Sequence, residues 1–251
     1  MERQNLTSSK RKVQVGFTLA EVLITLGIIG VVAAMTMPTL MTNYQKKSTA
    51  TQLKKTYATI SNAVRLSEEE NGELSGWEFE ENGTSTKSIQ VFDKYLAPYL
   101  KVTKKEVNGS NFTYYKPNGQ REAGLAILGG KSALYTMLSG VELLVNSGDI
   151  QYNPPIIGKA QASCMIIDLN GHNTKPNRFG RDAFFACINT EKGFTMHYSD
   201  DGERGAVQRT REQLKNGPSR EGYQCSKQGR GMWCGALIQR DGWTISKDYP
   251  W

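Results

Sequence analysis

Residues 10–40 read KRKVQVGFTLAEVLITLGIIGVVAAMTMPTL, a basic patch followed by an apolar run. The 21 residues from Phe17 to Met37 carry no charged side chain except Glu21. A helix of that length spans about 32 Å, close to the thickness of the hydrocarbon core of a bilayer. This stretch therefore predicts a membrane-spanning helix, and the basic residues before it predict a cytoplasmic N-terminus.

Two kinds of processing are compatible with such an N-terminus. A secretory signal has an apolar core of roughly 7–15 residues followed by a small-residue cleavage site, but this apolar run is longer and continues past its small residues. The second kind cuts before the run, between Gly16 and Phe17, and leaves the apolar helix in the mature protein. This position for the cut is the one we expect.

Glu21 is the residue that favours the second kind of processing. A carboxylate at the centre of a membrane helix costs about 2.5–3.5 kcal/mol, and less near an end, so it usually has a polar partner. A cut after Gly16 would place the new amine of Phe17 one helical turn from Glu21. We expect Glu21 to pair with the amine of a neighbouring subunit and to set the register of an assembly; the alternative is an interfacial Glu21 without a partner.

The segment GFTLAEVLITLGIIGVVAA resembles the N-terminal processing and methylation motif of type IV prepilins and type II secretion pseudopilins. The resemblance covers residues 16–40. It implies that a prepilin peptidase cuts between Gly16 and Phe17 and methylates the new N-terminal Phe17, and that Glu21 is the assembly carboxylate. Pro38 lies where pilin helices often carry a helix-disturbing proline. The implied partners are the peptidase, other pilin or pseudopilin subunits and an inner-membrane assembly platform.

The 251 residues divide into four predicted parts. These are a cleaved basic leader (1–16), a transmembrane assembly helix (17–38), the amphipathic soluble part of the same helix (39–71) and an extracytoplasmic globular head (72–251). We expect the helix to be interrupted around Pro38 and to end near Asn71-Gly72. Its soluble part carries one apolar stripe at helical spacing, made of Ala50, Leu53, Tyr57, Ile60 and Val64.

The head alternates between turn-rich segments and short apolar runs. Apolar, β-branched and aromatic residues predict strands at 163–169, 183–188 and 194–199, and two more on either side of Ser139-Gly140. Residues 88–100 read as a short amphipathic helix, 235–245 as a hairpin across Asp241-Gly242, and 200–231 as a polar excursion with one short helix. A long helix followed by strands predicts an α+β, pilin-like fold with an antiparallel sheet.

The loop DLNGHNTKPNRFGRDAF, residues 168–184, is the candidate metal site. Hard oxygen ligands suit Ca²⁺, although the loop is not an EF-hand because its twelfth position is Phe179. It resembles head loops of pilin-like proteins, and some pseudopilins carry calcium there. The alternative is an Asx turn at its start and a carboxylate that caps or ion-pairs at its end. The candidate calcium ligands are Asp168, Asn170, Asn173, Asn177 and Asp182.

Four cysteines, none in the N-terminal third and none in a CxxC motif, favour disulfides over zinc or free thiols in an exported head. Four cysteines allow three pairings. We expect Cys164–Cys187, on two strands that can be neighbours, together with Cys225–Cys234, which closes a short Gly-containing loop. The resemblance to pilins, many of which staple a C-terminal loop, favours the second pair more than the first.

Signals of an enzyme or of a nucleic-acid-binding protein are weak. The only histidines, His172 and His197, lie beside no nucleophile motif. The net charge is +7, of which residues 1–16 supply +3, so the remaining 235 residues carry +4 (7 minus 3). A charge that small favours solvated lysines over nucleic-acid binding.

The sequence thus predicts a non-enzymatic filament subunit in the bacterial inner membrane, with its head periplasmic or extracellular. A type II secretion pseudopilin is the first interpretation. A minor type IV or competence pilin, in adhesion or DNA uptake, is the second. A membrane-anchored enzyme or binding protein that only borrows a pilin N-terminus is the third.

Overall fold

The computed structural model describes residues 16–78, 86–107, 112–123, 125, 132–146, 162–189, 193–196, 209–219 and 222–251. It divides into two compact units, residues 1–45 and residues 46–251. His197, the end of the strand expected at 194–199, and residues 200–208 and 220–221 of the excursion expected at 200–231 lie outside the described residues.

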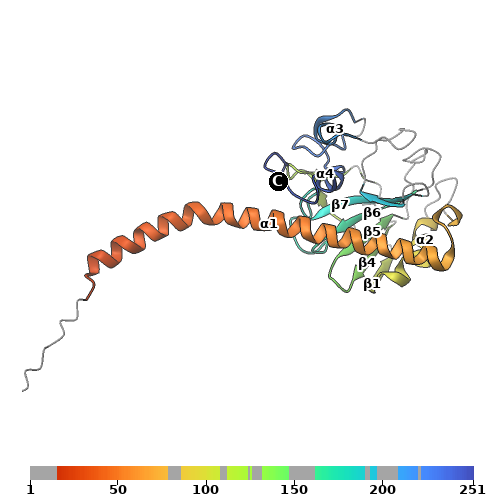
Figure 1. Ribbon diagram of the computed structural model, residues 1–251, viewed down its shortest axis with the longest axis horizontal. Helices are drawn as coiled ribbons and strands as arrows, with labels where there is room; N and C mark the ends of the chain where they lie inside the picture. The colour runs from red at the N-terminus through yellow and green to blue at the C-terminus, as the bar shows by residue number, and fades with distance from the viewer. Residues whose placement is uncertain are drawn as a thin grey trace, which may run out of the picture. The chain divides into compact units, whose positions relative to one another are not determined.

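One long helix and an antiparallel sheet dominate the chain (Figure 1). The helices are α1 Leu19–Asn71, η1 Leu74–Gly76, α2 Thr86–Tyr95, η2 Ala97–Tyr99, α3 Arg211–Asn216 and α4 Cys234–Arg240. The strands are β1 Val102–Val107, β2 Tyr114–Tyr115, β3 Arg121–Glu122, β4 Ser132–Met137, β5 Glu142–Asn146, β6 Ala162–Asp168, β7 Ala183–Asn189 and β8 Gly193–Met196. The predicted α+β, pilin-like fold is confirmed.

Six strands form the main sheet in the order β1-β4-β5-β6-β7-β8, and all neighbours are antiparallel. The β4–β5 hairpin turns at Ser139-Gly140 as predicted, with Gly140 at φ +82°. The strand β6 is buried on both faces, which explains why SCMIID is a nearly continuous apolar run. The edge strand β1, VTKKEV, is polar and largely exposed, which protects an open edge from pairing with other chains.

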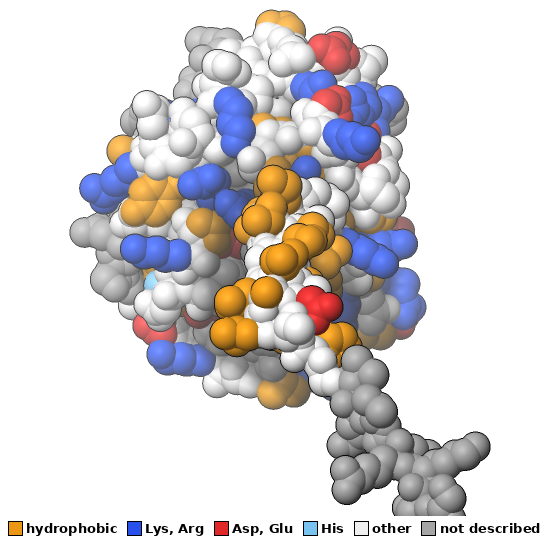
Figure 2. All heavy atoms as spheres, turned by 90° about the vertical axis from the view of Figure 1, so that its left-hand side faces the viewer, with side chains coloured by type: hydrophobic (Ala, Val, Ile, Leu, Met, Phe, Trp, Pro, Cys, Tyr) orange, Lys and Arg blue, Asp and Glu red, His pale blue; other side chains and the backbone are white. Residues whose placement is uncertain are grey.

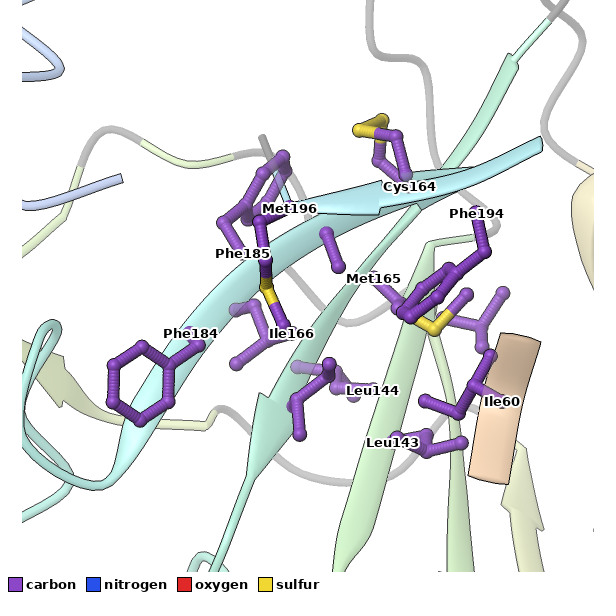
Figure 3. Close-up of a cluster of buried hydrophobic side chains, with 14 of the residues drawn as sticks. Ile60, Leu143, Leu144, Cys164, Met165, Ile166, Phe184, Phe185, Phe194 and Met196 are labelled. Atoms are coloured by element: carbon purple, nitrogen blue, oxygen red, sulfur yellow. A yellow bond between two sulfur atoms is a disulfide. The ribbon is translucent and has the colours of Figure 1, made fainter. Parts of the chain in front are cut away.

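The part of α1 after residue 45 packs on this sheet through the predicted stripe. Ala50, Leu53, Ile60 and Val64 are buried, and Tyr57 is half-buried. In Figure 3, Ile60 points from the helix toward the cluster of side chains that includes Leu143, Met165 and Phe194. The Tyr57 hydroxyl donates to the Phe194 carbonyl oxygen at 3.1 Å. The stripe thus fixes the rotation of the helix against the sheet.

The long helix α1 differs from the prediction at Pro38 and agrees with it at its C-terminal end. The helix α1 continues through Pro38, so the interruption expected there is wrong. A proline removes one main-chain hydrogen bond and crowds the carbonyl four residues before it, but the helix continues on both sides of Pro38. The helix ends where predicted: the Gly72 N–H donates to the Glu68 carbonyl at 3.0 Å, and Gly72 adopts φ +85°, a left-handed conformation that favours glycine.

The predicted hairpin at 235–245 is wrong, because residues 234–240 form the helix α4. Asp241-Gly242 is the end of this helix and not a hairpin turn: the Trp243 N–H donates to the Ile238 carbonyl at 2.8 Å. The run GALIQR is too short to distinguish the period of a strand from that of a buried helix. Tertiary packing favours the helix, since α4 lies on β7 and β8 and Gly235 lies close to the Met196 side chain.

Candidate processing and assembly site

The predicted cleavage site lies just before the first helical turn. Gly16, Phe17 and Thr18 have no regular secondary structure, and α1 begins at Leu19. The Phe17 residue is 89% exposed, and no atom lies within 4 Å of the position that a Cβ on Gly16 would take. A peptidase must fit the scissile peptide between its own groups, so an uncovered, non-helical bond is accessible to it.

Thr18 and Glu21 form a capping box at the start of α1. The Thr18 N–H donates to Glu21 Oε2 at 2.8 Å, and the Thr18 hydroxyl donates to the same oxygen at 2.7 Å. In return the Glu21 N–H donates to Thr18 Oγ1 at 3.2 Å. These bonds satisfy backbone N–H groups that the first helical turn leaves without carbonyl partners.

The capping box gives the carboxylate of Glu21 a partner inside its own chain. The spacing Thr18-x-x-Glu21 is the sequence signature of a capping box. The charge of Glu21 had instead predicted a pair with the amine of a neighbouring subunit or, as the alternative, a carboxylate without a partner. Glu21 can therefore be satisfied before any neighbouring subunit is present, and its pairing across subunits stays a prediction.

The helix after Glu21 presents an uncovered apolar surface. An 18-residue stretch of α1 has a mean hydropathy of 2.2, and none of its residues is buried. Figure 2 shows hydrophobic side chains gathered along this segment. Between Leu19 and Tyr44 the exposed large hydrophobic side chains are Leu19, Val22, Leu23, Ile24, Leu26, Ile28, Ile29, Val31, Val32, Met35, Met37, Leu40, Met41 and Tyr44. Such a surface needs lipid or other helices to cover it.

Four of the five candidate calcium ligands have hydrogen bonds within the head loop. Asp168 Oδ2 accepts from the Tyr114 hydroxyl at 2.9 Å, and Oδ1 accepts from the Asn170 N–H at 3.2 Å. The Asn170 side-chain amide donates to the Thr174 carbonyl at 3.2 Å. The start of the loop is thus the Asx turn that the alternative interpretation described.

The end of the loop is closed by Asp182. Its Oδ2 accepts from the Asn177 N–H at 2.8 Å and its Oδ1 from the Arg178 N–H at 2.6 Å. Asn177 donates its side-chain amide to the His172 carbonyl, while Asn177 Oδ1 is buried without a hydrogen bond among the described residues. Asn173 is exposed.

These contacts fit a calcium ion poorly, because each Asp carboxylate oxygen already accepts a hydrogen bond from the protein. Calcium takes six to eight oxygen ligands. Within the described part of the chain, no cluster of three or more His, Cys, Asp or Glu side chains is arranged to hold a metal ion. Calcium binding stays a prediction, which titration of the full chain with calcium chloride would check by calorimetry.

Burial controls the electrostatics of this loop. It raises the pKa of Asp168 to about 7, with a further rise from the charge of Asp182, against the lowering effect of the Tyr114 hydrogen bond. Burial also raises the pKa of Asp182, although the N–H groups of Arg178 and Asn177 lower it. The loop therefore holds its carboxylates as structural acceptors in a site that disfavours negative charge.

Both expected disulfides are present. Cys164 on β6 and Cys187 on β7 are directly opposite each other in the sheet and are bonded. Cys225 and Cys234 close the loop that precedes α4. Disulfides persist in oxidising compartments, so this pairing agrees with a head outside the cytoplasm.

Residues 39–251 match a family described as a family of unknown function (DUF6613). The chain belongs to this family. Residues 11–37 match the prokaryotic N-terminal methylation motif, which spans Gly16, Phe17 and Glu21. This DUF6613 protein is therefore type IV prepilin- or pseudopilin-like, and the motif implies processing by a prepilin peptidase. Neither the curated proteins nor the solved structures gave a match to the chain.

Proposed function

We propose that this DUF6613 protein is a subunit of a type II secretion pseudopilus or a related type IV pilus-like filament. The observation that carries the proposal is the methylation motif placed at the start of an uncovered apolar helix. A helix without cover in its own chain can be covered by identical or related helices. Packing of many such helices would make a filament whose core is apolar.

Each part of the N-terminus then has one task. The basic leader holds the N-terminus in the cytoplasm, and cleavage between Gly16 and Phe17 releases a new amine. Glu21 leaves its capping box, or shares it, to pair with the amine of an adjacent subunit and set the register. The apolar helix holds the subunit in the inner membrane before assembly, and the disulfide-bonded head lies outside the cytoplasm.

The test of processing is the intact mass of the protein purified from its native membrane, from strains with and without the prepilin peptidase. A chain that starts at Phe17 only in the strain with peptidase supports the proposal, and added methyl mass on Phe17 strengthens it. A chain that keeps residues 1–16 in both strains contradicts it and makes the apolar helix a plain anchor.

The proposed role of the Glu21 charge in pairing subunits can be tested separately from the role of Glu21 in the capping box. Glutamine at the third helical position also closes a capping box, so Glu21→Gln keeps the cap and removes the charge. We expect this variant to be cleaved normally but to lose filament assembly in sheared-filament preparations. Assembly at the wild-type level would contradict a charge pair between subunits.

The system served by the filament is tested in the deletion strain. A secretion pseudopilin predicts that exported proteins accumulate in the periplasm while surface pili and DNA uptake are unchanged. Loss of pili or of transformation with normal secretion would favour a minor or competence pilin. Normal behaviour in all three assays would favour an anchored enzyme or binding protein.

A further inference from the structure

Two cations contact Trp251, and a third lies near enough to act electrostatically on both of them. Arg178 and Arg181 come from the head loop between β6 and β7, and Lys227 comes from the loop closed by Cys225–Cys234. The Arg181 guanidinium lies 5.0 Å from the centre of the Trp251 ring. Lys227 Nζ donates to the Trp251 main-chain oxygen at 2.9 Å.

Two donors in this cluster are buried without an acceptor. They are Nε of Arg178 and the indole Nε1 of Trp251, neither of which has a hydrogen-bond partner among the described residues. Within the same part of the chain, neither Arg178 nor Lys227 forms an ion pair with a carboxylate. Asp182 in the same loop uses its two oxygens for main-chain N–H groups. Buried donors are rarely left unsatisfied, so each such donor calls for an explanation.

The positive charges in the cluster repel one another. Burial lowers the pKa of Lys227, and the charges of Arg178 and Arg181 lower it further. Burial and the charge of Arg178 likewise lower the pKa of Arg181. An anion placed between these groups would relieve the repulsion. Solvent can reach this cluster of cations, because Lys227 is exposed and Arg178 is half-buried.

We propose that Arg178, Lys227 and the indole N–H of Trp251 form a binding site for an oxyanion, a carboxylate or a phosphate group. The planar guanidinium of arginine matches two oxygens of such a group at once. Lysine adds a mobile point charge, and the indole adds one neutral donor. Arg181 stacks on the Trp251 ring and so positions the indole.

The test is a titration of the full chain in detergent micelles with sodium phosphate and, separately, sodium acetate, at constant ionic strength. The indole N–H of Trp251 and the Nε–H of Arg178 are followed by ¹H–¹⁵N NMR. We expect both signals to shift and to saturate. The indole N–H of Trp77, which donates to the Gly72 carbonyl at 3.1 Å, is the internal control and should not shift.

Two variants and one matched control identify the site. Arg178→Gln should abolish the saturable shift of Trp251, and Lys227→Gln should weaken binding about tenfold, as loss of one charged hydrogen bond does. Arg65→Gln, on the exposed side of α1, should bind like the wild type. Because the Arg178 side chain has no hydrogen-bond or ion-pair partner among the described residues, its variant should keep or raise the melting temperature without phosphate, which shows that it folds.

Three results would overturn the proposal. The first is a Trp251 signal that moves with neither anion. The second is an equal movement in the Arg178→Gln variant, which would indicate general salt effects. The third is binding only after two residues are added beyond Trp251, which would show that the carboxylate of Trp251 occupies the anion site.

Discussion

Replacement of Thr18 by valine tests whether the capping box holds the first turn of α1. The change removes the hydroxyl that accepts from the Glu21 N–H and donates to Glu21 Oε2, but it keeps the size and branching of the side chain. Loss of an N-terminal cap costs about 1 kcal/mol, within a range of about 0.5–2. A change of 1.4 kcal/mol alters an equilibrium constant about tenfold. We therefore expect a loss of about 1 kcal/mol to raise the equilibrium constant for opening of the first turn about fivefold.

Amide hydrogen exchange of the full chain in micelles measures this opening. The reporter is the N–H of Val22, which donates to the Thr18 carbonyl at 3.2 Å and is the first main-chain bond of the helix. Its protection should fall about fivefold in Thr18→Val. Protection of amides in the part of α1 that packs on the sheet should not change.

Thr25→Val is the matched control, because Thr25 lies about two helical turns after Thr18 and its hydroxyl donates to the carbonyls of Glu21 and Val22. That hydroxyl caps no N–H group, so its loss should leave the protection of Val22 within a factor of two, about 0.4 kcal/mol. Equal protection of Val22 in the wild type and in Thr18→Val would refute the capping argument. An equal loss in both variants would refute its specificity.

The head supports three further predictions. Ile60→Ala should lower the free energy of unfolding, measured in urea titrations, by about 2–5 kcal/mol. Thr59→Ala, on the exposed face of α1, should change it by less than about 0.5 kcal/mol. Equal effects of the two variants would contradict the packing of α1 on the sheet. Arg230 binds the buried Glu122 through two bonds of 2.9 Å, so Arg230→Ala should cost about 3–5 kcal/mol, and adding Glu122→Gln should recover part of that loss. Because Asp168 has a pKa of about 7 in the folded state and about 4 when unfolded, the folded state binds the extra proton between these values. Stability should therefore fall as the pH rises from 4 to 7, by at most about 4 kcal/mol; Asp168→Asn should remove that slope, and an unchanged slope would exclude Asp168 as its source.

Elements with long or repeated patterns were predictable from the sequence. The apolar run after Phe17 and the stripe from Ala50 to Val64 each extend over several helical turns, so their period is unambiguous. The strands β6 and β7 are continuous apolar runs bounded by turn residues. The pairing of Cys164 with Cys187 followed from the expectation that these strands are neighbours.

Short elements decided by tertiary contacts were harder to predict. The helix α4 has seven residues, and its packing on β7 and β8 determines its conformation. The strand β1 carries three consecutive charged residues and, among the described strands, pairs only with β4, so no apolar pattern marks it. The spacing of Thr18 and Glu21 matches a capping box, but a charged residue in an apolar run equally predicts a pair between subunits. The two unpaired donors, on Arg178 and Trp251, lie far apart in the sequence.

The order of strands in the sheet affects how the head can fold during export. From β5 onward, each strand pairs with the strand that precedes it in the chain. A head that emerges from a translocation channel N-terminal end first can therefore add each new strand to an edge that already exists. It does not need to wait for a distant segment, which keeps unpaired edges short-lived. The link between Cys164 and Cys187 can close only after β7 has emerged, so it would secure a sheet whose centre is already in register.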